Sequence, residues 1–119
     1  MNKFSVFVSY SQLAVFDAAL AKPLNNWLHD HVAQGFSWRH GSVSFKTLTE
    51  GDQYEIDLVK TDVDIPVLPT AIRVIQVPFD VSKNGLVEVA SISGGVQAEL
   101  IPGEYALRFE CYPNLKIRL

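Results

Sequence analysis

Short runs in which apolar and polar residues alternate recur along almost the whole chain. In the first run, Phe4, Val6 and Val8 alternate with Ser5 and Phe7. Because successive side chains of a strand point to opposite faces, this period of two predicts a strand with one buried face. Residues 13–20 fit either a strand or a helix, and a strand is favoured for their first half. Further strands are predicted at residues 43–46, 54–59, 72–79, 87–89, 96–100, 105–111 and 115–119.

Turn-forming residues separate these runs. Asn84-Gly85 is typical of a tight hairpin, because both residues readily take a positive φ. Pro66 and Pro69 bracket a loop, because proline cannot donate a hydrogen bond to a sheet. Strands this short, with turns at this spacing, predict a mostly β fold. Specifically, we expect an antiparallel β-sandwich of about 7–9 short strands.

Two runs indicate where their strands lie in the sandwich. Residues 72–79 are apolar on both faces, which predicts a central strand. Tyr105 follows Pro102-Gly103 at the start of another run. This arrangement is typical of a tyrosine that anchors the corner of a sandwich through its hydroxyl group.

One segment, residues 23–34, has helical periodicity instead. Pro23 is favoured in the first turn of a helix because its missing N–H would have no partner there. Gly35 follows as a left-handed stop. The apolar residues fall on a single stripe, and they are Leu24, Trp27, Leu28 and Val32. We therefore expect one amphipathic α-helix at residues 23–34.

Length and composition fit a single domain covering residues 1–119. The 119 residues are 48% hydrophobic and 19% charged, which is enough apolar material for one core. The single cysteine, Cys111, has no partner for a disulfide and falls on an apolar strand face, which predicts a buried, unreactive thiol. No run approaches the roughly 20 apolar residues of a membrane span. We expect a cytoplasmic protein without membrane insertion.

The residue types that catalyse reactions or bind metals do not converge at the spacings typical of such sites. His29 and His31 would point about 200° apart on the expected helix and could not share a metal, and His40 falls in a predicted loop. No serine has the Gly-x-Ser-x-Gly context of a hydrolase nucleophile. We therefore predict no catalytic residues, no metal site and no cofactor, and a protein that is not an enzyme.

The most distinctive chemical feature is an acidic segment, residues 50–64. It contains one basic residue, Lys60, and six carboxylates, which are Glu50, Asp52, Glu55, Asp57, Asp62 and Asp64. Glu55 and Asp57 share the polar face of a predicted strand, and the others are expected in the loops at its ends. Three interpretations compete: charges that protect a sheet edge from aggregation, Ca²⁺ binding by loop carboxylates, or a negative patch that binds a cationic protein.

Net charge and one tryptophan bear on the kind of partner. The formal net charge is −3 and the basic residues are scattered. Binding to nucleic acid depends on clustered Lys and Arg, so direct nucleic-acid binding is not expected. Trp38 lies beside Arg39 in a predicted loop and is either packed in the core or exposed as an interface contact. The candidate partner-binding residues are Trp38 and the six carboxylates of the acidic segment.

A set of segments that spans nearly the whole chain carries a family resemblance. The segments are Ser9–Phe16, Trp27, Gly35-Phe36, Gly41–Phe45, Val77–Ile92 and Leu100–Leu107. In this order they resemble the competence protein J family. The likeness lies in strands, turns and core positions, and it is weakest at residues 49–71, which include the acidic segment.

The resemblance implies an activity that needs no catalytic residue. The founding member of the family inhibits a bacterial nuclease of DNA uptake. The leading hypothesis is therefore a non-catalytic inhibitor that binds a bacterial nuclease and occludes its active cleft. A related protein could instead serve as an immunity protein against a toxin nuclease. The alternative function is a β-sandwich module that binds Ca²⁺ or a small ligand.

Overall fold

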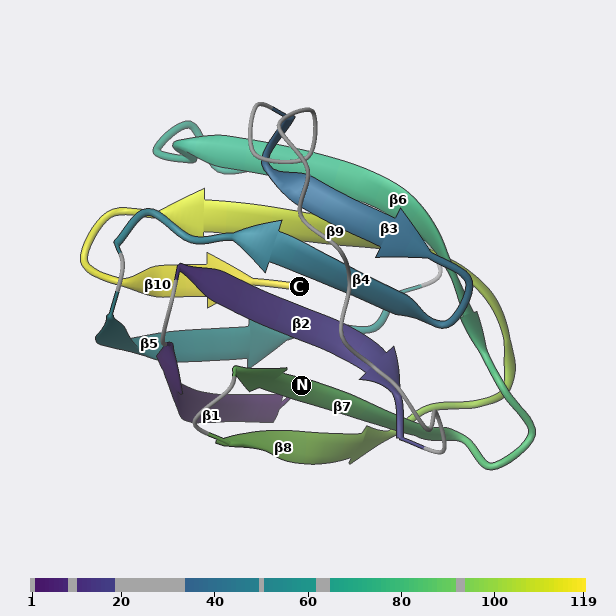
Figure 1. The fold of residues 1–119 in the computed structure, drawn as a ribbon. Coiled ribbons are helices and arrows are strands. Elements are labelled where there is room, and N and C mark those ends of the chain that lie inside the picture. Colours follow the sequence, from purple (N-terminus) through teal and green to yellow (C-terminus); the bar gives the residue numbers. More distant parts are fainter. Residues whose placement is uncertain (1, 9–10, 19–33, 50, 62–64, 92–93) are drawn as a thin grey trace.

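Two sheets packed face to face make up the fold (Figure 1). The structure, a computed structural model, describes residues 2–8, 11–18, 34–49, 51–61, 65–91 and 94–119. Sheet A contains, in order across the sheet, β1 (Asn2–Val8), β5 (Asp52–Leu58), β10 (Lys116–Arg118), β9 (Gly103–Tyr112) and β6 (Arg73–Val81). Sheet B contains β3 (Phe36–Arg39), β4 (Ser42–Lys46), β2 (Gln12–Asp17), β7 (Leu86–Ser91) and β8 (Gly94–Glu99). Neighbouring strands are antiparallel except β10 and β5, which are parallel.

The core lies between the sheets, because each strand points alternate apolar side chains at the opposite sheet. At its centre Phe45 of β4 stacks on Phe109 of β9, with ring centroids 4.3 Å apart and planes 2° from parallel. Both rings are fully buried. Around them lie other buried residues from both sheets, among them Val6, Val8, Leu13, Val15, Tyr54, Ile56, Val77, Phe79, Val87, Val89, Cys111 and Ile117. Burial of this apolar surface is the main stabilising term of the fold.

The predicted antiparallel-rich sandwich is confirmed. The described residues form ten strands, whereas about 7–9 were expected, and the strand favoured in the first half of residues 13–20 is β2. The predicted helix, residues 23–34, lies outside the described residues apart from Gln34. In the ranges that the structure describes, no helix is long and apolar enough to cross a membrane.

Trp38 lies in a strand, so its predicted place in a loop is wrong. Gly35 and Gly41, with φ of 88° and 80°, turn the chain at the two ends of β3, and between them Trp38 pairs with Val43 of β4. A strand of four residues is too short for alternation to reveal it. Trp38 is 43% exposed, and its indole N–H donates to the carbonyl oxygen of Pro78 at 2.7 Å. This bond joins an edge strand of sheet B to an edge strand of sheet A.

β6 is an edge strand of sheet A, so the central position predicted for residues 72–79 is wrong. Its two-sided apolar character comes from Ile72 and Val74, whose side chains are 56% and 43% exposed. Pro78 suits an edge strand, because the side without a neighbour needs no backbone donor. The pattern of apolar and polar residues in the sequence indicates a strand, but it does not reveal whether that strand has a neighbour on both sides.

The predicted tyrosine corner is present at the start of β9. The hydroxyl of Tyr105 donates to the carbonyl oxygen of Ile101 at 2.6 Å. The adjacent hairpin turns at Gly85, which has the expected positive φ, 67°, whereas Asn84 does not take a positive φ. The N–H of Gly85 donates to the carbonyl oxygen of Ser82 at 2.9 Å. Together these bonds fix the end of the sandwich where β6, β7 and β9 meet, which is also one end of the cavity described below.

Replacing Tyr105 with Phe should lower the free energy of unfolding by about 1 kcal/mol, because it removes one intramolecular hydrogen bond and little apolar area. Urea denaturation followed by circular dichroism measures the change. An unchanged unfolding midpoint would show that this hydroxyl does not stabilise the corner.

Candidate functional site

The outer face of sheet A carries the part of the acidic segment that lies in the described residues. β5 points Tyr54 and Ile56 into the core, where both are fully buried. Glu55 and Asp57 therefore lie on the opposite, outer face. Glu55 is exposed and Asp57 is half-buried. The structure thus brings these two predicted partner-binding residues together on one strand.

Cations flank both carboxylates on the neighbouring strands. Lys3 of β1 is paired with Asp57, and on the other side Lys116 and Arg118 of β10 are paired with Glu55 and Asp57. Opposite charges at cross-strand positions attract each other. The outer face therefore has one row in which Lys3, Asp57 and Arg118 alternate in charge, and beside it the opposite charges of Glu55 and Lys116. Because β5 lies between β1 and β10, Glu55 and Asp57 do not protect a sheet edge, so that interpretation is wrong for these two residues.

The other predicted partner-binding residues do not join this pair. Asp52 is the first residue of β5, in the strand and not in the expected loop, and strand alternation turns it away from Glu55 and Asp57. Trp38 contacts β6, which β10 and β9 separate from β5 in sheet A. Three of the predicted carboxylates lie outside the described residues, namely Glu50, Asp62 and Asp64.

A hollow of about 380 Å³ opens on the outer face beside the two carboxylates. Glu55, Asp57 and Lys116 border it on the strands, and Leu68 and Tyr112 border it as well. One oxygen of Asp57, Oδ1, is buried and accepts no hydrogen bond within the described part of the chain. A buried acceptor without a partner costs free energy, so a donor supplied by a bound protein would stabilise it.

A buried carboxylate, Glu110, lies on the same outer face and is held by two arginines and a tyrosine. Nε of Arg108 is 2.6 Å from one of its oxygens, and Nε of Arg118 is 2.6 Å from the other. The hydroxyl of Tyr112 donates to the second oxygen at 2.5 Å. The guanidinium of Arg118 also lies 5.9 Å from the centre of the Tyr112 ring. We call Glu110, Arg108, Arg118 and Tyr112 the Glu110 cluster.

The Glu110 cluster fastens the loop that follows the acidic segment. Arg108 donates to the carbonyl oxygen of Ile65, and Arg118 donates to that of Pro66 at 3.1 Å. The backbone N–H of Leu68 donates to the hydroxyl of Tyr112 at 3.4 Å. Three members of the cluster therefore hold residues 65–68 against the sheet, and Glu110 holds the three members in place. Sequence reasoning missed the cluster, because strand alternation marks Glu110 as solvent-facing and gives no sign of the loop above it.

The cluster keeps Glu110 ionised. Burial alone would raise the pKa of Glu110, but hydrogen bonds from Arg118 and Tyr112 and the positive charges of Arg118 and Arg108 outweigh burial. The pKa of Glu110 is therefore below its ordinary value. The hydrogen bond to Glu110 raises the pKa of Arg118 above its ordinary value.

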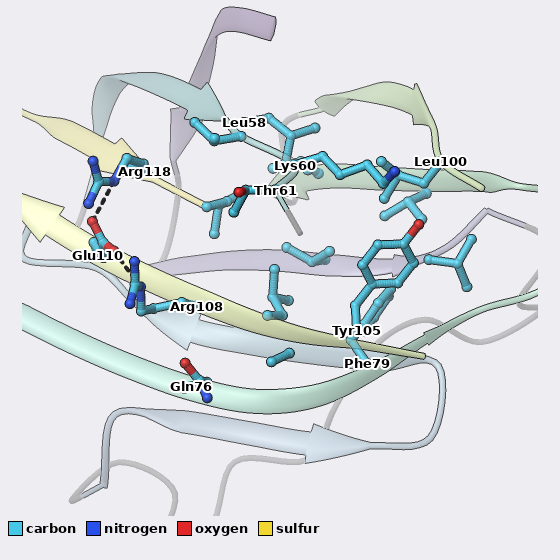
Figure 2. Close-up of a pocket in the computed structure, with 18 of the residues that line it drawn as sticks. Leu58, Lys60, Thr61, Gln76, Phe79, Leu100, Tyr105, Arg108, Glu110 and Arg118 are labelled. Atoms are coloured by element: carbon cyan, nitrogen blue, oxygen red, sulfur yellow. Dashed lines mark hydrogen bonds and ion pairs between the residues drawn. The ribbon is translucent and has the colours of Figure 1, made fainter. Parts of the chain in front are cut away.

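A second cavity, of about 450 Å³, opens between the sheets next to the cluster (Figure 2). Figure 2 shows Tyr105 and Phe79 at one end of it and Glu110 with its arginines at the other. Val15 and Val89 of sheet B contribute apolar lining, and Lys60 lies across the cavity from β9.

The described residues do not assemble a recognisable reactive centre. No three His, Cys, Asp or Glu residues among them are grouped so as to hold a metal ion. The thiol of Cys111 is fully buried, and burial raises its pKa to about 11, so the reactive thiolate is suppressed. The buried position predicted for Cys111 is confirmed.

Comparison with known proteins assigns the family. The family model of competence protein J (ComJ) matches residues 5–117. The chain belongs to the competence protein J family. Among solved structures, the chain is similar to the crystal structure of ComJ, inhibitor of the DNA degrading activity of NucA, from Bacillus subtilis, with a TM-score of 0.79 and 19% sequence identity, covering 99% of this chain and 93% of that one. At this identity the likeness shows that the ComJ fold is shared. No curated protein sequence matches the chain significantly.

Replacing Glu110 with Gln in this ComJ-family chain should lower the free energy of unfolding by about 3 kcal/mol at neutral pH, because two half-buried arginines lose their buried counter-charge. A lowered folded-state pKa means that the stabilisation is complete above the ordinary pKa of 4.5 and is lost as the pH falls through the folded value. The stability difference between the wild type and E110Q should therefore shrink as the pH falls below the ordinary value. Urea denaturation at a series of pH values measures it.

The matched control is Glu99→Gln, which removes a charge from an exposed carboxylate on β8. Its stability should equal that of the wild type. A difference between E110Q and the wild type that stays constant down to acidic pH would contradict the assignment of Glu110 as an ionised group.

Proposed function

We propose that the chain is a non-catalytic inhibitor that binds a bacterial nuclease and blocks its degradation of DNA. Membership of the competence protein J family carries this proposal. The ComJ of known structure is an inhibitor of the DNA degrading activity of NucA. Inhibition by occlusion requires a shaped, charged surface and no reactive side chain, which fits the described residues of this chain.

The outer face of sheet A is our candidate for the docking surface. A nuclease must attract polyanionic DNA, so its active cleft is expected to be cationic. Glu55 and Asp57 offer carboxylates to such a cleft, and the alternating cations Lys3 and Lys116 select a partner with a matching pattern. Oδ1 of Asp57, which accepts no hydrogen bond from the described residues, supports the same face, because a donor from the nuclease would satisfy it.

The remaining carboxylates of the acidic segment, Glu50, Asp52, Asp62 and Asp64, would add to the long-range attraction without direct contact being required. A contact of the nuclease with Trp38 stays a separate prediction, since Trp38 lies at a different edge of the molecule.

We further propose that the protein works in the cytoplasm. The only cysteine of the chain is Cys111, so its folded state does not depend on an oxidising compartment. Immunodetection in separated cytoplasmic, membrane and external fractions of the native host tests this, and recovery mainly outside the cytoplasm would contradict it.

The purified chain should suppress degradation of linear DNA by its cognate nuclease, the enzyme most similar to NucA encoded in the same genome, with saturation at one-to-one stoichiometry. Glu55→Lys should slow association several-fold at low salt, because it reverses a charge that steers the encounter. Surface plasmon resonance at increasing salt measures the association rate, and the difference should fade as screening increases.

Glu99→Lys is the matched control, since it makes the same charge change on an exposed strand of sheet B. Its association rate should fall less than that of E55K. Equal effects of the two variants would contradict a docking surface on the outer face of sheet A, but they would not contradict the inhibitory function. Full nuclease activity at a large excess of the chain would contradict the function itself.

A further inference from the structure

β9 has a strand neighbour along only part of one side. β6 pairs with β9 from Gly103 to Cys111, whereas β10 pairs with it only from Glu110 to Tyr112. Beyond β10, the space between residues 104–108 of β9 and residues 58–61 holds no strand from the described residues. We call this space, which continues the line of β10 between β5 and β9, the open lane.

The cavity shown in Figure 2 runs along the open lane. Its lining includes the consecutive residues 104–108 on one side and 58–61 on the other. Because successive residues of a strand face opposite sides of the sheet, a cavity that touches five in a row lies along the strand's edge and not on one face. The backbone edge of β9 therefore borders the cavity, whereas on the other side the N–H of Val59 already donates to Leu119 at 2.9 Å.

The hydrogen-bonding direction of β9 indicates that the backbone groups of Ala106 point into the open lane. The carbonyl oxygen of Pro78 accepts a bond from Trp38, on the side of β6 away from β9. In an antiparallel pair the N–H and C=O of one residue point the same way, so Pro78 and its partner Ala106 form a pair without mutual hydrogen bonds. The N–H and C=O of Ala106 consequently face the open lane.

We propose that the open lane accepts an extended segment of the nuclease, which pairs with β9 as an added strand. This inference rests on the proposed function, because it assigns the segment to the inhibited enzyme. The segment would run as β10 does, antiparallel to β9, over about five residues. It would supply a backbone partner for Ala106.

The chemistry of the lining defines the segment more closely. Side chains that point inward would meet Val15, Val89 and Phe79, so alternate residues of the segment should be apolar. Lys60 is exposed beside the cavity and makes no ion pair or hydrogen bond within the described residues. A carboxylate on the segment would complement this positive charge. A purely hydrocarbon ligand fits less well, because it cannot bond to the unpaired backbone groups.

Hydrogen exchange by nuclear magnetic resonance tests the proposal at single residues. In the free protein the amide of Ala106 should exchange quickly, whereas that of Leu107, which faces β6, should be protected. In the complex with the cognate nuclease, Ala106 should gain at least about tenfold protection and Leu107 should stay unchanged. This alternating pattern distinguishes an added strand from general shielding of the surface.

Proline variants test the hydrogen bond of the Ala106 N–H through the affinity of the chain for the nuclease. Ala106→Pro removes the N–H that faces the open lane while leaving the pairs of β9 with β6 intact, and it should weaken the complex by about tenfold. Val74→Pro is the matched control, because the N–H of Val74 also faces away from β9, on the free edge of β6. Its affinity should match that of the wild type, with folding of both variants checked by their amide spectra.

Charge variants test the carboxylate of the segment. Lys60→Glu should weaken the complex several-fold, whereas Lys83→Glu, which changes the charge of an exposed turn residue, should have a smaller effect. Equal effects of K60E and K83E would overturn the assignment of Lys60.

The outcomes separate this inference from the proposed function. Inhibition and binding without protection of Ala106 would overturn the added strand and leave the inhibitory function intact. Protection of Ala106 in the free protein would also overturn the added strand. Protection that rises with protein concentration would mean that a second copy of the chain occupies the open lane. Protection that does not depend on concentration would mean that a segment of the same chain occupies it. Failure to form any complex with the nuclease would overturn both.

Discussion

The three residues of β10 join the two halves of sheet A. They pair in parallel with β5 and antiparallel with β9, and no other strand of the described residues lies between those two. Ile117 anchors β10 in the core, where it is 2% exposed. On the outer face, Arg118 is fixed by Glu110 of β9. A buried ion pair contributes little net stability after desolvation, so the contact chiefly fixes the position of β10 against β9.

This junction links the two surfaces discussed for partner binding. On one side of β10, Lys116 and Arg118 complete the charge rows that begin with Glu55 and Asp57. Beyond its last paired residue, the sheet opens into the cavity along β9. The cavity and the hollow on the outer face of sheet A are adjacent, since Arg118 borders both. One partner can use both, with charge directing the encounter and backbone pairing slowing dissociation.

The sequence predicted the parts of this fold that depend on local pattern. Alternation located most strands, and Pro102-Gly103 followed by Tyr105 predicted the corner that the hydrogen bond to Ile101 confirms. Features that depend on strand neighbours were not accessible from the pattern. Residues 72–79 have the apolar content of a central strand, yet β6 lies at an edge, because alternation does not reveal sheet order.

The candidate site was predictable only in part, for the same reason. Glu55 and Asp57 lie two positions apart on one strand, so their shared face could be predicted. Lys3 and Lys116 come from opposite ends of the sequence and become neighbours only through sheet register. Glu110 alternates like an exposed residue, and its burial depends on residues 65–68, which its own strand does not specify.

The late position of β10 in the chain has a consequence for synthesis. β5 and β9 are both synthesised before the strand that joins them, and β10 must then pair with β5 across a long sequence separation. Such non-local pairing is slow to form. A chain in which β10 has not yet paired therefore exposes the facing edges of β5 and β9, which makes it vulnerable to mispairing and to chaperone capture.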